Sequence, residues 1–385
     1  MIYIGIDISK YKHDCFIATK SSLSFSFENN QSGFKTLLDH FQCLQKQDMI
    51  IGLEATGHYG DNLKSFLTSH GYTFMEVNPF LVKKFSDSKS LRKIKTDKKD
   101  AKLIAEFMST VDYKAYHHQS YHISALKSLT RWRAKLISFR TSQYNMMTKT
   151  LDIIFPEFKP FMNEQGFSDT SLYILKRFTT PAKIAKMNDS HYDTLRKRSM
   201  GKFSYPKFTK LRSLASETVG ISKPFQVAKL KSLISYVEKL NEDIQHLESE
   251  ITSIMKNYPT YFQSIKGMGI ITAAIILAEY GEISLFDNPS QMVSYAGLDS
   301  SIHQSGTMAS TGKLVKRGSK YLRSALINVT MTVMIYNPVF YQYYDTKRKQ
   351  GKHHRVACVH LAKKLIRIIH HLEKTQTMFN PQLLN

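Results

Sequence analysis

The stretch YIGIDIS, residues 3–9, places one acid, Asp7, among apolar side chains in a short run of alternating character. Such a run predicts a β-strand with at least one buried face. Two similar runs follow, CFIAT at residues 15–19 and LSFSF at residues 23–27. The beginning of the chain therefore predicts three strands joined by short turns.

Helices and strands alternate after these three strands. The predicted elements are a helix at 33–45, a strand at 49–54, a helix at 61–71, a strand at 73–79 and a helix from about residue 96. Three strands followed by strand, helix, strand and helix is the element order of a ribonuclease-H-like domain. We therefore predict an α/β N-terminal domain over residues 1–115.

The remainder of the chain has mostly helical patterns. Residues 124–155 predict one long, basic, amphipathic helix, which ends near Pro156. Farther along, an unbroken heptad repeat is formed by Leu230, Leu233, Val237, Leu240, Ile244, Leu247, Ile251 and Ile254. This repeat favours a two-stranded coiled coil, whose second strand is either the earlier long helix or the same helix of another chain. We predict a coiled-coil, dimerisation and nucleic-acid-binding region at 116–257, a mostly helical serine-containing domain at 258–345 and a basic helix at 346–385.

The charge of the chain indicates a polyanionic partner. Lysines and arginines number 54 against 31 acids, a formal net charge of +23 spread along the sequence, which favours nucleic acid. The longest apolar run, Ile270 to Ala278, is too short to span a bilayer, and we expect no signal peptide. Cys15, Cys43 and Cys358 are scattered without metal-ligand spacing, which predicts reduced thiols in a cytoplasmic protein.

Two aspartates lie inside the most lysine-rich run of the chain, KIKTDKKDAKLIAEF at residues 93–107. At about 100° per residue, Asp97 and Asp100 share one side of a helix with Ala101 and Ile104, and the lysines occupy the other side. The aspartates either cap the helix and face its dipole, or belong to a carboxylate site on the packed side.

Two further acids favour the carboxylate site. Asp7 lies in the first strand, where a lone carboxylate is unfavourable, and Glu54 ends a buried strand. In a ribonuclease-H-like sheet these two strands are neighbours, and the later helix packs across them. Asp7, Glu54, Asp97 and Asp100 would then converge, as carboxylates must to hold one or two Mg²⁺ ions at a scissile phosphate.

Four stretches carry a resemblance to a known family. GIDISK, GLEATGHY, VNPFLVKKFSDSKSLRKIKTDKKDAKLIA and GLDSSIHQSGTMASTGKLVKRGSKYLRSAL closely resemble the DEDD transposases of bacterial insertion sequences. These are the serine-containing, bridge-RNA-guided recombinases of the insertion-sequence group numbered one-hundred-and-ten. The match runs in order over nearly the whole chain, although this chain has Asp299 where the family commonly has proline.

The resemblance implies a mechanism and its residues. It implies that Asp7, Glu54, Asp97 and Asp100 are the metal ligands of a RuvC-like domain, and that Ser305 is the nucleophile that forms a phosphoserine link with DNA. It further implies donor and target DNA and a structured non-coding guide RNA as partners. We expect the coiled coil to join chains into a dimer or tetramer.

Basic side chains and a flexible loop surround the proposed nucleophile. Ser305 precedes Gly306, which would allow a phosphate to approach closely. Ser300, Ser301 and Ser310 are alternative nucleophiles, and His303 is a weaker candidate for a base. We expect nucleic-acid contacts from Lys83, Lys84, Arg92, Lys93, Lys95, Lys98, Lys99, Lys313, Lys316, Arg317, Lys320 and Arg323.

Two other functions fit parts of the pattern. A RuvC-like nuclease that resolves DNA junctions would use the same acids with water and leave Ser305 idle. A non-catalytic RNA-binding protein would need neither the acids nor the serine. The Gly-x-Gly of IKGMGIITAAIIL, with Gly267 and Gly269, is either a phosphate-binding helix-hairpin-helix turn or an ordinary turn.

Overall fold

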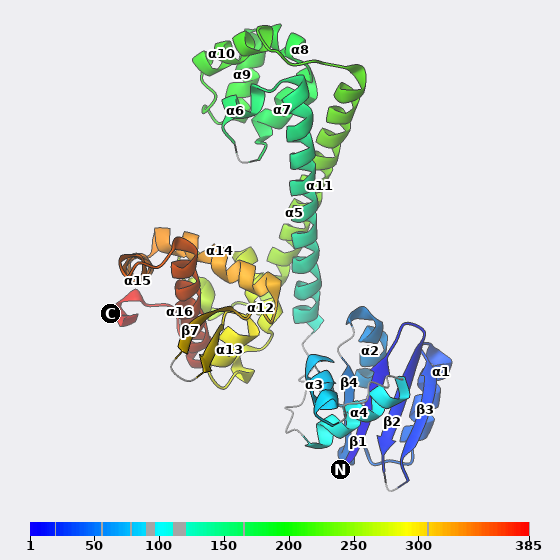
Figure 1. The fold of residues 1–385 in the computed structure, drawn as a ribbon. Helices are drawn as coiled ribbons and strands as arrows, with labels where there is room; N and C mark the ends of the chain where they lie inside the picture. Colours follow the sequence, from blue (N-terminus) through cyan, green and yellow to red (C-terminus); the bar gives the residue numbers. More distant parts are fainter. Residues whose placement is uncertain are drawn as a thin grey trace. The chain divides into compact units, whose positions relative to one another are not determined.

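The computed structural model of the protein describes residues 1–19, 21–54, 57–77, 79–89, 97–110, 121–164, 166–305 and 308–384. The chain divides into two compact units, Met1–His118 and Gln119–Asn385 (Figure 1). Each unit has hydrophobic cores of its own. The expected mixed α/β N-terminal part and mostly helical remainder are confirmed. Among the helices that the structure describes, none combines the length and apolarity needed to cross a membrane.

The first unit is built on a five-stranded sheet with the strand order β3-β2-β1-β4-β5. Its strands are β1 (Ile2–Ile8), β2 (Lys12–Ala18), β3 (Leu23–Glu28), β4 (Met49–Glu54) and β5 (Phe74–Val77). β2 is antiparallel to both β1 and β3, whereas β4 is parallel to both β1 and β5. The predicted adjacency of the first strand and the strand ending at Glu54 is therefore confirmed.

Helices cover both faces of this sheet. They are α1 (Gln31–Phe41), α2 (Asp61–Ser69), α3 (Pro79–Lys89) and α4 (Asp97–Thr110), with short 3-10 helices at Lys46–Asp48 and Gly57–Gly60. Ile4 and Ile6 of β1 share a core with side chains of α1 and α2. The opposite face packs against α4, whose Ala101 and Ala105 form a cluster with Phe16 of β2.

One helix of this unit was not predicted. Pro79 was expected to end a strand ahead of a basic segment, whereas in the structure β5 ends at Val77 and Pro79 begins α3. Proline is favoured at the first position of a helix because its missing N–H would have no partner there. Pro79 therefore marks the start of a helix rather than the end of a strand.

The second unit contains two long helices that pack side by side, α5 (Tyr121–Ile154) and α11 (Pro224–Asn257) (Figure 1). At one end they join the short helices α6 (Phe158–Met162), α7 (Asp169–Phe178), α8 (Pro181–Ala185), α9 (Asp189–Arg198) and α10 (Tyr205–Ser216). Leu230, Leu233 and Val237 are buried there with Met147 and Leu151 of α5. The heptad repeat of α11 thus packs against α5 of the same chain. Of the two predicted partners, the earlier long helix is therefore the one that the structure shows for these residues.

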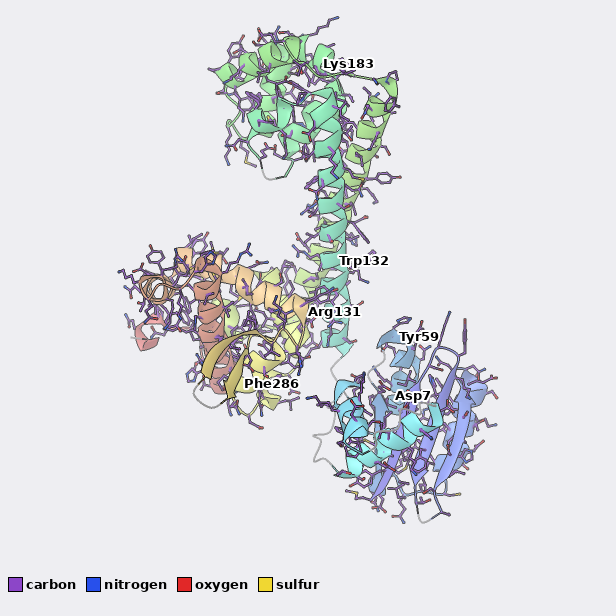
Figure 2. The ribbon with its side chains drawn as sticks, viewed as in Figure 1. Asp7, Tyr59, Arg131, Trp132, Lys183 and Phe286 are labelled. Carbon is purple, nitrogen blue, oxygen red and sulfur yellow. The ribbon has the colours of Figure 1, made fainter. Side chains whose placement is uncertain are left out.

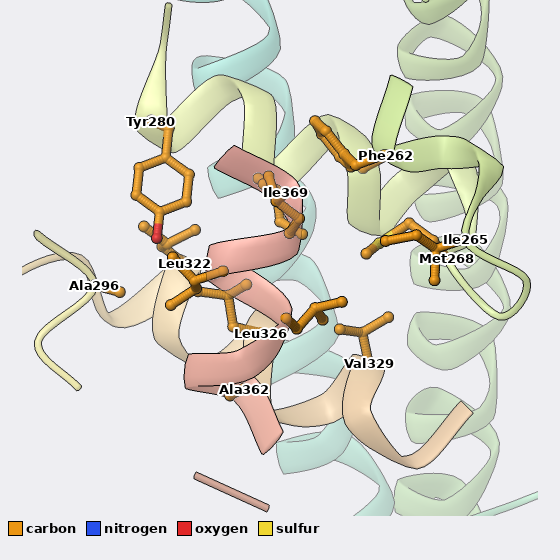
Figure 3. Close-up of a cluster of buried hydrophobic side chains, with 14 of the residues drawn as sticks. Phe262, Ile265, Met268, Tyr280, Ala296, Leu322, Leu326, Val329, Ala362 and Ile369 are labelled. Atoms are coloured by element: carbon orange, nitrogen blue, oxygen red, sulfur yellow. The ribbon is translucent and has the colours of Figure 1, made fainter. Parts of the chain in front are cut away.

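The C-terminal part of the second unit packs against the other end of α5, mainly through α12 (Ile270–Tyr280). Its other elements are α13 (Pro289–Tyr295), β6 (Ser300–Ser305), β7 (Met308–Leu314), α14 (Lys320–Tyr336), α15 (Pro338–Lys349) and α16 (His354–Thr375), with 3-10 helices at Tyr261–Ser264, Ile283–Leu285 and Pro381–Leu384. Figure 3 shows part of its core, where Leu322 and Leu326 of α14 lie near Ile369 of α16.

An ion pair between a partly exposed arginine and a buried glutamate links α5 to this core. Arg131 of α5 donates two hydrogen bonds to Glu279 of α12, Nε to Oε1 at 2.6 Å and Nη2 to Oε2 at 2.9 Å. The Arg131 guanidinium also lies over the Tyr321 ring, 5.3 Å from its centroid. Because Glu279 is fully buried, its charge depends on this bidentate pair together with a hydrogen bond from Ser319.

Candidate active site and nucleic-acid interface

Asp7 and Glu54 lie at the ends of two adjacent parallel strands. The pairing of β1 with β4 runs in register from Ile2 opposite Met49 to Ile6 opposite Leu53. The next positions along the two strands are Asp7 and Glu54, and both residues are half-buried. The carboxyl ends of neighbouring parallel strands meet at one edge of a sheet, so the register brings the two acids to the same edge.

The face on which these acids lie follows from strand alternation. Side chains two residues apart point to the same face, so Asp7 shares the face of Gly5 and Glu54 shares the face of Gly52. A Cβ added at Gly5 would collide with the backbone of Ala101, and one added at Gly52 would collide with the Met108 side chain. Both acids therefore belong to the face covered by α4.

α4 begins with the other two acids. Its first residue is Asp97, one helical turn before Ala101, and Asp100 is half-buried in the same turn. The structure describes the side chain of Asp100, whereas that of Asp97 lies outside the described residues. Asp97 and Asp100 thus start the helix whose next turn touches Gly5, two residues before Asp7.

The donor atoms at this edge suit a hard cation. Carboxylate oxygens are the ligands that Mg²⁺ prefers in proteins. Among the side chains that the structure describes, which exclude that of Asp97, no group of three His, Cys, Asp or Glu residues is close enough to hold a metal ion. The support for a metal site is therefore the strand register and the chemistry of the four acids.

Ser305 is the last residue of β6, in the two-stranded sheet that β6 forms with β7. It is paired with Met308, and residues 306–307 between them lie outside the described part. Where a loop was expected, the backbone of Ser305 therefore lies in a strand that pairs with β7. The side chains of residues 301–313 lie outside the described residues, including those of Ser305, His303 and Lys313.

Exposed cations cluster between β7 and α14. Lys316 and Arg317 are exposed in the segment between the two elements, and Lys320 is exposed as the first residue of α14. Arg323 differs, because it is half-buried and its Nη1 donates to the carbonyl oxygens of Ala296, at 3.1 Å, and Lys316, at 3.4 Å. Arg323 therefore stabilises the backbone next to the exposed cations Lys316, Arg317 and Lys320.

The remaining predicted nucleic-acid contacts fall in the first unit. Lys83 and Lys84 are exposed on α3, and Lys99 is exposed on α4. Arg92, Lys93 and Lys95 lie outside the described residues, as does the side chain of Lys98. Of the two glycines in the Gly-x-Gly turn, Gly267 packs against the backbone of Thr332, whereas open space surrounds Gly269.

Sequence reasoning missed a buried acid beside Asp7. Asp14 of β2 is opposite Asp7 in the antiparallel pairing, and Ser26 of β3 is opposite Asp14. The Ser26 hydroxyl donates to Asp14 Oδ1 at 2.5 Å. An acid in the second strand of a meander was the available signal, but only the register places it next to Asp7.

Two family models match the chain in the order of its parts. The DEDD transposase model of the IS110 family, described as "Transposase", matches residues 4–156. The model described as "Transposase IS116/IS110/IS902 family" matches residues 260–345. The first match includes all four candidate acids, and the second includes Ser305.

Relatives match most or nearly all of the chain. The pilin gene-inverting protein of Moraxella bovis is 24% identical over 390 residues, covering 99% of this chain and 98% of the relative. An uncharacterized 44.8 kDa protein of insertion element IS116 from Streptomyces clavuligerus is 22% identical and covers 99% and 96%. An uncharacterized 43.6 kDa protein of insertion element IS110 from Streptomyces coelicolor is 23% identical and covers 75% and 73%. From the two ordered domain matches and these relatives we conclude that the chain belongs to the IS110/IS116 family of insertion-element transposases and is a DNA transposase or recombinase.

Proposed function

We propose that this transposase cuts and rejoins DNA with Ser305 as nucleophile, and that Asp7, Glu54, Asp97 and Asp100 of a RuvC-like domain hold Mg²⁺. The observation that carries the proposal is the parallel pairing of β1 with β4. It puts two acids at adjacent strand ends on the face covered by α4, the helix that begins with the other two acids.

The four acids would hold the cation, and their position at the edge of the sheet limits the cost of burying their charge. Asp7, Glu54 and Asp100 are half-buried and so keep part of their surface in water, which lowers the cost of their charge before the cation arrives. Mg²⁺, when bound, supplies positive charge that stabilises the phosphate group under attack. Carboxylate oxygens such as these would suit a hard cation of this kind.

Ser305 would exchange one phosphate ester for another. Its Oγ forms a bond to the phosphorus of one DNA strand, and the bond from phosphorus to a deoxyribose oxygen breaks. The serine proton is released and the departing oxygen takes up a proton, so no oxidant or energy source is needed. Attack by the hydroxyl of another strand then reverses the step and frees the serine. The reaction requires Ser305 to reach the acids of the first unit, in its own chain or in another copy.

The exposed cations of the second unit would hold the DNA during this exchange. Lys316, Arg317 and Lys320 follow directly on the strand pair that carries Ser305. Lysine and arginine at such positions neutralise phosphates without reading the sequence. Their removal should therefore weaken binding to all sequences alike and reduce its dependence on salt.

A structured non-coding RNA would supply the sequence specificity. The chain has a net charge of +23 and contains no motif known for reading base edges, which suits recognition by base pairing. The test is strand exchange with purified protein and RNA transcribed from the flanks of its gene. We expect no exchange without the RNA and a changed target when its pairing bases are changed. Exchange by the protein alone would exclude guidance.

Association of chains would use a face of α5 other than the one packed on α11. Large exposed side chains recur every seven residues along α5 at Trp132, Phe139, Met146 and Ile153 (Figure 2 labels Trp132). This spacing keeps them on one stripe of the helix. Phe139→Glu should reduce the oligomer measured by light scattering, whereas Tyr236→Glu, at an exposed position of α11, should not. A wild-type monomer at all concentrations would exclude the proposed oligomer.

The serine mechanism is tested by trapping a covalent adduct on a nicked suicide substrate. We expect the adduct with wild-type protein and with Ser310→Ala, a serine of the facing strand. We expect none with Ser305→Ala. If Ser305→Ala retains strand joining, Ser305 is not the nucleophile.

The same assay separates the two rival functions. A junction-resolving nuclease would cleave without an adduct, and its cleavage would survive Ser305→Ala. A non-catalytic RNA-binding protein would be unaffected by Asp97→Asn and Asp100→Asn. The proposed mechanism predicts that both aspartate variants lose cleavage and keep nucleic-acid binding.

A further inference from the structure

A row of oxygen-bearing side chains crosses four strands of the first unit. The strand register aligns Glu54 of β4, Asp7 of β1, Asp14 of β2 and Ser26 of β3. Residues opposite each other in neighbouring strands point to the same face, with Cβ atoms of antiparallel pairs about 5 Å apart. Phe16, two residues after Asp14, packs against Ala101 of α4. The whole row therefore lies on the face covered by α4.

Asp14 is the most buried acid of this row. It is only 4% exposed, whereas Asp7 and Glu54 are half-buried. Its described polar contacts are the hydroxyl of Ser26, at 2.5 Å, and the ammonium of Lys12, at 3.7 Å. The Lys12 side chain is more than half exposed, so water weakens its attraction for the carboxylate.

These contacts compensate a buried carboxylate only in part. An ionised carboxyl group offers about four acceptor positions, and burying its charge is unfavourable unless it is well paired. An apolar residue of similar volume would pack against α4 without this penalty, as Phe16 does two residues later. A charge retained at this cost, directly opposite Asp7, favours a role in the function of the neighbouring acids.

We propose that Asp14, held by Ser26, is a positioning residue that raises the affinity of Asp7 and its neighbours for a divalent cation. The inference rests on the carboxylate site of the proposed function. Asp14 adds a negative charge about one strand spacing from Asp7. The Ser26 hydroxyl fixes the orientation of the Asp14 carboxylate. Hydrogen-bonded groups just outside the metal ligands commonly orient those ligands and raise the affinity for the metal.

The test measures binding of Mn²⁺, a spectroscopic substitute for Mg²⁺, to the full-length chain by electron paramagnetic resonance and calorimetry. We expect Asp14→Asn to weaken Mn²⁺ binding about 10- to 100-fold, the usual effect of removing an outer partner. Ser26→Ala, which frees the carboxylate but keeps its charge, should weaken binding several-fold. Asp39→Asn is the matched control, because it removes an equal charge from an exposed position on α1.

Thermal unfolding without metal separates positioning from a purely structural role. Asparagine can still accept the Ser26 hydrogen bond and no longer repels Asp7, so the metal-free melting temperature of Asp14→Asn should equal or exceed that of wild type. A structural role predicts the reverse, a lower metal-free melting temperature with unchanged Mn²⁺ affinity. Should Asp14→Asn fail to fold, the Ser26→Ala result decides the question.

The same measurements distinguish failure of the proposed metal site from failure of the proposed role of Asp14. If wild-type protein binds no Mn²⁺, the metal site of the proposed function is excluded, and this inference with it. If wild type binds Mn²⁺ and both Asp14→Asn and Ser26→Ala bind it equally well, only the role of Asp14 is excluded.

Discussion

Arg131 and Glu279 form a bidentate ion pair that ties the long helix α5 to the buried helix α12, although 148 residues separate them in the chain. Glu279 is fully buried, and Arg131 is half-exposed and stacks on Tyr321 (Figure 2 labels Arg131). The pair therefore fixes where α5 meets the C-terminal part of the second unit.

Arg131→Met should destabilise the protein because the buried Glu279 carboxylate loses its bidentate partner and keeps only weaker interactions such as the hydrogen bond from Ser319. Removing one side of a buried pair typically costs about 3 kcal/mol or more. The measurement is the free energy of unfolding from urea denaturation. Arg133→Met is the control, since its partner Glu248 is partly exposed and such a pair contributes about 1 kcal/mol or less. Equal losses in the two variants would contradict a special role for the Arg131 pair.

The same pair predicts how stability depends on pH. Burial alone raises the pKa of Glu279, but hydrogen bonds from Arg131 and Ser319 outweigh it and hold the pKa below its ordinary value of 4.5. The resulting stability is fully present above about pH 4.5, and it is lost as the pH falls through the lowered pKa. Below about pH 4.5, the melting temperature should fall less steeply with pH in the double variant Arg131→Met/Glu279→Leu than in wild type. An equal slope in the two proteins would show that other carboxyl groups dominate the acid dependence of stability.

Local patterns predicted much of the first unit because strands and helices show their periodicity in short windows. YIGIDIS and MIIGLE became adjacent parallel strands, and the apolar side of the helix that begins at Asp97 became the side packed on the sheet. Longer-range features escaped prediction. The register that places Asp14 opposite Asp7 and the ion pair of Arg131 with Glu279 join residues whose sequence context says nothing of the partner.

Weak periodicity explains the missed elements of the second unit. Residues 300–314, SSIHQSGTMASTGKL, pair as β6 and β7. They contain few large apolar side chains, so the alternation of apolar and polar residues that predicts a strand is absent. The heptad repeat of α11 was visible, but a repeat specifies a partner helix without saying which chain supplies it.

The three cysteines should react at very different rates. Cys43 is exposed, whereas Cys15 and Cys358 are buried, and burial together with the charge of Asp14 raises the pKa of the Cys15 thiol. Because the thiolate is the reactive form, a maleimide should label Cys43 alone in the native protein and all three after denaturation. Mass spectrometry of intact protein checks this. Fast native labelling of Cys43→Ser would contradict the burial of the other two.

Gly5→Ala should displace the helix that begins at Asp97 and Asp100. A Cβ at Gly5 would collide with the carbonyl oxygen of Ala101 and the backbone nitrogen of Ala105, and a helix backbone cannot yield locally as a side chain can. We expect a loss of stability of roughly 3 kcal/mol, at the upper end for overpacking. A shift of α4 by about 1 Å should also lower DNA cleavage about 100-fold, because catalytic geometry is sensitive to such displacements.

Gly52→Ala is the matched control on the adjacent strand, since its Cβ would meet mainly the flexible side chain of Met108. That side chain can adopt another rotamer, so we expect a loss of about 1 kcal/mol and cleavage close to wild type. Urea denaturation and cleavage of labelled DNA, measured on both variants at equal folded fractions, separate stability from activity. If Gly5→Ala folds and cleaves DNA as well as Gly52→Ala, the contact between β1 and α4 does not position the acids for catalysis.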